Sequence, residues 1–315
     1  MFGSYLKRIK YGFSLSIESL KFSVKNLDVS LLYVIGSILA SVPAWIGYYI
    51  VSNLFELLGF AGYSTLAGGV ASVGIYTFVF FFVRGTIVHI TGARMLGENV
   101  SLIDGIRNVS QNPELFLRWA VIKAVVRMLY RLSRQSNNNI AGRILRYFAD
   151  MAMSIWKAAT YFILPTLTFY SSDDTKAEAA QSIYVLRKRY LEIASVKIAT
   201  MVLYIVGFFF WIFLAMTIVI GGFSAGFPIA GILLFFVTVF GGMLLFWLIS
   251  MYMRDVVRTA LYLESEAPEK VTGFNTSVFG AEIPDDETVR KDFVPNSVEE
   301  FLEKHKGDGK FEDRL

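Results

Sequence analysis

Residues 197–254 read KIATMVLYIVGFFFWIFLAMTIVIGGFSAGFPIAGILLFFVTVFGGMLLFWLISMYMR, with a charge only at each end. The 56 residues between Lys197 and Arg254 are enough for two membrane-spanning helices, because each span needs about 20 apolar residues. The glycines and the proline at 221–228 are typical of a tight turn. This stretch therefore predicts two membrane helices joined by a short turn.

Two further uncharged runs have the length of a membrane span. One covers residues 29–51, directly after Asp28, and the other covers residues 59–83 and ends at Arg84. The whole chain is 55% hydrophobic and only 18% charged, whereas soluble domains are about 25% charged. We therefore predict an all-α, polytopic integral membrane protein whose membrane domain covers residues 29–265.

The positions of the basic residues predict the topology. Lys7, Lys10, Lys21 and Lys25 precede the first span, whereas the connection at 52–64 has one charge, Glu56. Because basic residues stay on the cytoplasmic side, the N-terminus is expected there. Arg254 and Arg258 follow the last span and return the chain to the same side. We therefore expect a cell-membrane protein with both termini in the cytoplasm.

The first 28 residues are expected to form an amphipathic helix. Its apolar residues recur at intervals of three or four and are separated from lysines, as in helices that lie among lipid headgroups. They are Tyr5, Leu6, Ile9, Phe13, Ile17, Leu20 and Val24.

The middle of the chain predicts a helical hairpin with mixed character. Segments 114–132 and 140–166 are apolar but carry several basic residues, and both flanks should be cytoplasmic. The pair is either two full spans with polar faces turned inward or a hairpin that enters from the cytoplasm without crossing. Asp150 is the only carboxylate of the second segment. Arg146, four residues earlier, is a ready partner for it, and Lys123 or Arg127 could reach it across the hairpin. Asp150 either neutralises neighbouring arginines within an interfacial helix or forms an intramembrane polar pair with Arg127.

The basic residues of this hairpin are the best candidates for a binding site. Arginine and lysine at a cytoplasmic membrane surface attract anionic lipid headgroups, but they also set topology. The candidates for lipid or anion binding are Arg118, Lys123, Arg127, Arg131, Arg143 and Arg146. Nucleic acid is not expected, because the charges alternate with Trp119, Val125 and Leu129.

Several motifs resemble a prokaryotic family of multi-pass membrane proteins, a domain of unknown function numbered 6159. They are the segments TGARMLGENVSLIDGI at 91–106, LRWA at 117–120, SIWKAATYFILP at 154–165, AQS at 180–182, LRKRY at 186–190 and TALY at 259–262. The resemblance covers about residues 10–264. It implies about six membrane helices, which would count the hairpin segments as spans, and it implies no activity.

Residues 266–315 form an acidic tail with a net charge of −6, against +10 for the rest of the chain. Ser297 followed by Glu300 is a capping box and predicts a short helix at 297–306 within a largely flexible segment. Val298, Phe301 and Leu302 would give this helix an apolar face. That face could dock a soluble partner protein or fold back onto the basic loops.

The chemistry available to this chain is narrow. It has no cysteine and only two histidines, His89 and His305, and it has no phosphate-binding or dinucleotide-binding motif, so we expect no metal, no cofactor and no enzymatic activity. We expect His89 to be an interfacial side chain. Two functions are favoured: a membrane scaffold or accessory subunit that binds lipid or partner proteins, and a small-solute transporter or channel that uses the Arg-rich hairpin. A membrane-embedded enzyme that acts on a lipid headgroup is a third, disfavoured alternative, because no nucleophile or metal cluster stands near Asp150 in the sequence.

Overall fold

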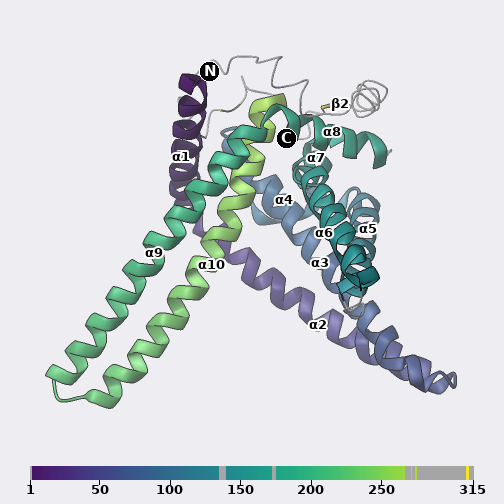
Figure 1. Cartoon of the computed structure of the whole chain (residues 1–315), viewed down its shortest axis with the longest axis horizontal. Coiled ribbons are helices and arrows are strands. Elements are labelled where there is room, and N and C mark those ends of the chain that lie inside the picture. Colours follow the sequence, from purple (N-terminus) through teal and green to yellow (C-terminus); the bar gives the residue numbers. More distant parts are fainter. Residues whose placement is uncertain are drawn as a thin grey trace. The chain divides into compact units, whose positions relative to one another are not determined.

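The computed structural model describes residues 2–134, 140–171, 175–266, 271, 274 and 310–311. Within these residues the chain is helical apart from two paired strands of two residues each (Figure 1). The helices are α1 (Phe2–Lys25), α2 (Leu27–Leu57), α3 (Ser64–Met95), α4 (Leu102–Ser110), α5 (Pro113–Arg134), α6 (Ile140–Ala159), α7 (Ile163–Phe169), α8 (Thr175–Lys188), α9 (Tyr190–Ser224) and α10 (Pro228–Glu266). A 3-10 turn, η1 (Ala61–Tyr63), precedes α3.

Four helical segments are long and apolar enough to cross a membrane. They are Leu27–Leu57, Ala61–Met95, Glu192–Ser224 and Ile229–Glu266. The all-helical fold and these four segments confirm the coarse prediction from hydropathy. Among the described helices, α5 and α6 do not belong to this set, so the count of six is not confirmed.

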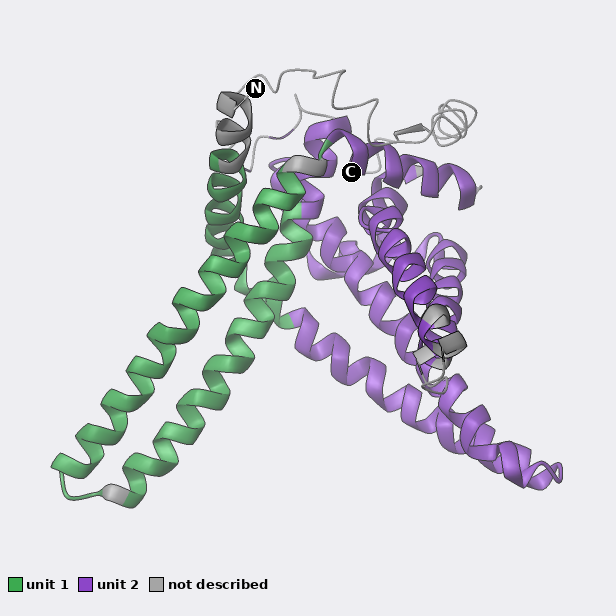
Figure 2. Ribbon diagram, viewed as in Figure 1, with its two compact units in different colours: residues 1–31, 189–257, 275–285 green, residues 32–188, 258–274, 286–315 purple. Residues whose placement is uncertain are grey.

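The chain divides into two compact units, which are described separately (Figure 2). The first unit contains residues 1–31, 189–257 and 275–285, so that α1, α9 and most of α10 belong to it. The second unit contains residues 32–188, 258–274 and 286–315, with most of α2, all of α3 to α8, and the end of α10.

In the first unit, α9 and α10 form the hairpin predicted from residues 197–254. The turn lies between Ser224 and Pro228, and Gly226 there has a φ of 78°, a left-handed conformation that favours glycine. Farther along the pair, the Trp211 indole fits against Gly242 and donates a hydrogen bond of 2.6 Å to the Thr238 carbonyl oxygen. Only 6% of the most apolar part of α9 and 11% of that of α10 are buried, as expected for helices that face lipid.

Helix α1 packs on α9 through a face that the sequence analysis did not single out. Leu15, Ser16, Ser19 and Ser23 on this face are completely buried. Gly12 lies so close to Ser195 of α9 that any side chain at position 12 would overlap it. The predicted apolar side of α1 is the other side: Ile17 and Val24 are exposed. The helix is therefore held by protein on one face and is exposed on another.

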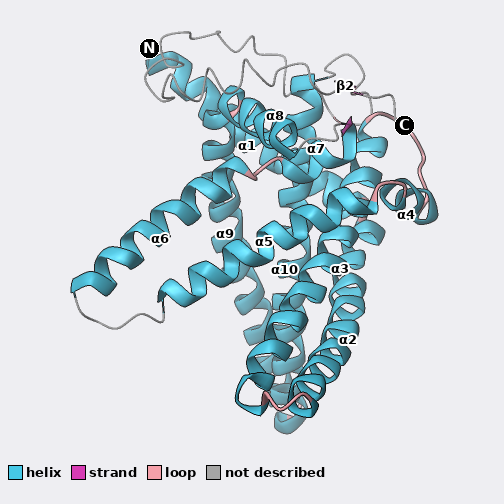
Figure 3. Ribbon diagram, turned by 90° about the vertical axis from the view of Figure 1, so that its right-hand side faces the viewer, coloured by secondary structure: helices cyan, strands magenta, loops and turns pink. Residues whose placement is uncertain are grey.

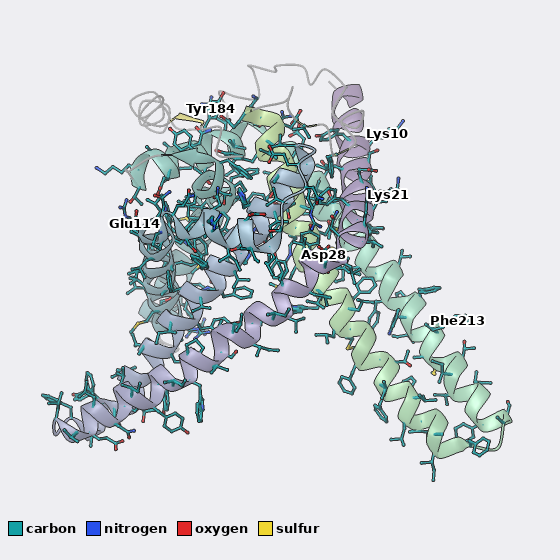
Figure 4. All side chains as sticks on the ribbon, turned by 180° about the vertical axis from the view of Figure 1, so that it is seen from behind. Lys10, Lys21, Asp28, Glu114, Tyr184 and Phe213 are labelled. Carbon is teal, nitrogen blue, oxygen red and sulfur yellow. The ribbon has the colours of Figure 1, made fainter. Side chains whose placement is uncertain are left out.

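The side chains of the first unit agree with this division of faces. Lys10 and Lys21 project from the outer side of α1, and Phe213 stands out from α9 (Figure 4). Phe213 is 72% exposed. A large aromatic side chain this open fits a lipid environment far better than water.

In the second unit, α3 changes its surroundings along its length. Up to Arg84 it packs against α2. There the Val83 side chain lies against Gly36, and the Ser52 hydroxyl donates a hydrogen bond of 3.1 Å to the Ser64 carbonyl oxygen. From Gly85 to Ala93 every residue is buried. A helix that is buried on all sides lies inside protein, so Arg84 marks the point where the partly exposed stretch of α3 ends and the helix enters a helical body.

The other helices of the second unit build this body around the end of α3. Helices α4, α5 and α7 pack on α3, and α8 packs on α6 and α7. The Arg258 guanidinium, near the end of α10, lies 4.3 Å from the centre of the Tyr161 ring. The strand β1 (Tyr170–Ser171) pairs antiparallel with β2 (Lys310–Phe311), which brings these two tail residues back onto the body.

Two local expectations are wrong. The segment expected to be helical over 140–166 breaks, because α6 ends at Ala159 and α7 begins at Ile163 as a separate, fully buried helix. Pro165 lies in the first turn of α7, where its missing N–H costs no hydrogen bond. His89 is not interfacial: it is 4% exposed and stacks on Phe169 at 6.3 Å between ring centres.

Candidate functional site

The candidate site is the α5–α6 hairpin of the second unit. The two helices lie side by side and leave the side of α3 at a steep angle (Figure 3). Helix α5 begins at Pro113, a residue favoured at a first helical position because its ring pre-sets φ and its missing N–H is not needed there.

Helix α5 has two opposed faces. One carries an apolar stripe, Leu117, Val121, Val125 and Leu129, at intervals of four residues, and each of these side chains is about half exposed. The basic residues Lys123, Arg127 and Arg131 also recur every four residues, but they are offset from the apolar stripe by two. An offset of two residues is about 200° of helix rotation, so the basic stripe lies on the other side of α5.

The basic stripe begins beside α3. Phe116 fixes the two helices together, since its ring contacts Phe81, Phe82 and Gly85. About two turns further along α5, the Lys123 ammonium lies 4.7 Å from the centre of the Phe81 ring, a cation–π contact. Burial lowers the pKa of the Arg127 guanidinium, and the charges of Arg131 and Arg84 lower it further.

Helix α6 carries the second half of the site. Tyr147, Met151 and Ile155, again four residues apart, are exposed and give α6 an apolar stripe of its own. Arg143 is exposed on the same helix, and Arg146 is half-buried.

The candidate pair Arg127–Asp150 has a different arrangement in the structure. Asp150 is exposed and accepts a hydrogen bond of 2.6 Å from the Tyr130 hydroxyl of α5. Asp150 therefore links α6 to α5, while Arg127 lies on the basic stripe of α5.

The base of the hairpin is anchored to α8 by polar contacts. Arg118 donates a hydrogen bond of 3.0 Å to the Thr175 hydroxyl. The Trp119 indole donates to Glu178, a carboxylate with no exposed surface. Ser182 donates to the Ala159 carbonyl oxygen over 2.7 Å and accepts from the Phe162 N–H over 3.2 Å, so it bridges the break between α6 and α7.

Sequence reasoning placed Arg118 in a lipid-binding stripe and overlooked Glu178. Thr175 followed by Glu178 has the spacing of a capping box, and this signal marks the start of α8. It does not reveal that Glu178 pairs with Trp119, because the two residues are 59 positions apart. Arg118 therefore has a structural contact at the base of the hairpin.

One other site was predicted, the docking face in the tail. The tail residues Val298, Phe301 and Leu302 lie outside the described residues. Within the described part of the chain, no group of three or more His, Asp or Glu side chains could hold a metal ion. Searches against protein-family models, curated proteins and solved structures found no match.

Proposed function

We propose that this protein is a non-enzymatic membrane scaffold that attaches a helical body to the bilayer and contacts lipid through the α5–α6 hairpin. The observation that carries this proposal is the split of α5 into an exposed apolar face and a basic face that lies beside the end of the lipid-facing stretch of α3. Amphipathic helices of this composition bind at the boundary between headgroups and acyl chains.

The same observation supports a hairpin that enters the membrane from one side without crossing it. A full span would carry Lys123, Arg127 and Arg131 through the bilayer centre, where each charge costs a few kcal/mol or more. At the headgroup level these residues meet phosphate and water, while Val125 and Leu129 meet acyl chains. The positive-inside rule places this surface, the body and both termini in the cytoplasm. On this proposal, the membrane helices number four.

The alternative of a solute transporter needs polar side chains that converge on an enclosed pathway at mid-membrane depth. Arg127 and Asp150, the candidates for such a pathway, are both exposed on the hairpin. On the scaffold proposal, partner proteins would bind the helical body or the acidic tail.

A depth measurement tests the proposal. The chain has no cysteine, so Val125→Cys gives a single site for an environment-sensitive fluorophore on the apolar face of α5. In vesicles, we expect lipids with a quencher near the headgroup to quench this probe strongly. Ser110→Cys on the exposed end of α4 is the matched control and should not be quenched. Equal, weak quenching at both positions would show that the hairpin does not touch the bilayer.

A further inference from the structure

The turn between α2 and α3 carries a cluster of exposed apolar side chains. Residues 57–63 read LLGFAGY, and the one charged residue in the whole stretch 29–83 is Glu56. Leu57 is 85% exposed, the largest value for any large apolar side chain in the described part of the chain. The cluster consists of Leu54, Leu57, Leu58, Phe60, Tyr63 and Leu66, each of which is at least half exposed. An apolar surface of this kind marks a contact with lipid or protein.

The turn also bonds its own backbone. Gly59 has a φ of 84°. Its N–H donates to the Glu56 carbonyl oxygen over 3.0 Å, and the Phe60 N–H donates to the Phe55 carbonyl oxygen over 2.8 Å. These two bonds make a Schellman motif, which the Phe55 and Phe60 rings complete at 6.2 Å between their centres. On the α3 side, the Tyr63 N–H donates to the Phe60 carbonyl oxygen over 2.9 Å. These bonds need no water, which is a condition for backbone close to hydrocarbon.

The length of α2 bears on where this turn lies. The 29 residues from Val29 to Leu57 are helical and rise about 43 Å, whereas the hydrocarbon core of a bilayer is about 30 Å thick. An upright α2 would carry the turn past the headgroups into water. A tilt within the usual range, up to about 40°, keeps the turn at the headgroups. Tilting costs little for each ångström of mismatch, but large apolar side chains in water are costly, so the tilted arrangement is favoured.

Glu56 limits how deep the turn can lie. Its side chain is exposed, and a carboxylate is costly within hydrocarbon. At the headgroup level Glu56 meets water and polar groups, while Leu57 and Phe60 reach acyl chains. Tyr63 fits the same level, because tyrosine rings are enriched where headgroups meet acyl chains.

We propose that the α2–α3 turn lies at the headgroup level of the outer leaflet, with its apolar side chains against acyl chains and with α2 and α3 tilted to hold it there. Phospholipid is the occupant of this surface, because the turn continues the exposed apolar surfaces of two helices that are long and apolar enough to cross a membrane. The inference goes beyond the proposed function, which concerns the α5–α6 hairpin at the cytoplasmic surface. It gives the chain a second anchor in the opposite leaflet.

Depth measurements on single cysteines test this placement. The chain has no cysteine, and Leu57→Cys and Tyr63→Cys each place one fluorophore at an exposed position of the turn. Ser224→Cys, an exposed position at the end of α9, is the control, because Ser224 is polar and its turn is expected on the same side of the bilayer. Each protein is placed in phosphatidylcholine vesicles. The fluorescence is then quenched by iodide in the water, by a spin label on the headgroup or by a spin label at the middle of the acyl chain.

We expect the headgroup label to quench both probes of the α2–α3 turn most strongly. Iodide should quench these two probes several-fold less than it quenches the Ser224 probe, because lipid covers much of the turn. The same order should hold in bilayers of shorter and of longer acyl chains, because a change in the tilt of α2 and α3 keeps the turn at the headgroups.

Three other results would overturn the inference. Equal quenching of the Leu57 and Ser224 probes by iodide would mean that α2 stands upright and that the turn projects into water. Strongest quenching by the label at the middle of the acyl chain would place the turn inside the core. Shielding from all three quenchers would mean that protein, such as a second copy of the chain, covers the turn. The Val125→Cys probe tests the proposed function separately, because it lies on a different surface.

Discussion

Single residues set the connection between α3 and α4. Gly97 ends α3 with a φ of 88°, and the N–H groups of Leu96 and Glu98 bond back to carbonyl oxygens of the last turn. Ser101 then starts α4 as the N-cap of a capping box with Asp104. These residues lie within the motif at 91–106, so a stop, a turn and a helix start account for much of its sequence.

The capping box predicts a local effect of substitution and of pH. Ser101→Ala should destabilise the start of α4 by about 1 kcal/mol. A loss of this size should make hydrogen exchange of the α4 amides roughly five times faster. The Ser101 hydroxyl and N–H donate to Asp104 and hold the pKa of that carboxyl below its usual range. The stabilisation is therefore complete above the usual carboxyl pKa and is lost as the pH falls through the lower, folded value.

Hydrogen exchange of α4, measured at matched pH in the unchanged protein and in Asp104→Asn, checks the sign. The exchange rates of α4 in the two proteins should differ near neutral pH and become equal in acid. In acid, Asp104 of the unchanged protein is protonated in both the folded and the unfolded state. A difference that grows on acidification would show that the capping box does not stabilise α4.

A second residue-scale prediction concerns the buried carboxylate Glu178. Glu178→Ala leaves the Trp119 N–H without its acceptor and opens a cavity, so we expect a loss of about 2–4 kcal/mol of stability. Glu178→Gln keeps an acceptor oxygen and nearly the same volume, and should lose clearly less. Thermal unfolding in detergent measures both variants, and an equal loss would show that the Trp119 hydrogen bond is not the reason for the burial of Glu178.

At the scale of the element, hydropathy predicted the long helices and missed the breaks. The α9–α10 turn falls within residues 221–228 because apolar length and turn residues are local properties of the sequence. The end of α6 at Ala159 depends on Ser182, which bonds to Ala159 and Phe162 across the break. No local pattern within 140–166 contains that contact, and Pro165 indicated a break six residues too late.

The α9–α10 hairpin offers a closely matched pair of substitutions. Gly242→Ala places a Cβ where the Trp211 indole lies, whereas Gly241→Ala has nothing within 4 Å of the added Cβ. Overpacking of this kind costs about 1–3 kcal/mol, so Gly242→Ala should lower the unfolding temperature in detergent. Gly241→Ala should be neutral or slightly stabilising, because alanine favours helix more than glycine does. The reverse order would contradict the packing of these two helices.

At the scale of the whole molecule, composition was enough to predict a helical membrane protein, but it could not separate lipid-facing from protein-facing helix. The span predicted at 59–83 continues as helix to Met95 because the body surrounds residues 85–93. Likewise, basic residues in the middle of the chain identified a candidate surface, while the contact of Lys123 with the Phe81 ring required the packing of α3 on α5. Contacts between residues that are far apart in sequence account for what the patterns left out.

Labelling of single cysteines tests the arrangement of the whole chain across the membrane. Ser224→Cys lies in the exposed end of α9 and should react with a membrane-impermeant reagent added to intact cells, because the positive-inside rule places the uncharged α9–α10 turn outside. Asn99→Cys, in the exposed connection after α3, should react only after the cells are opened.

Ser136→Cys, in the connection between α5 and α6, separates the two models of the hairpin. Protection in intact cells supports entry from the cytoplasmic side, four membrane helices and a basic stripe at the headgroups. Reaction from outside would mean that α5 and α6 cross, which would restore six membrane helices and place Arg127 within the bilayer.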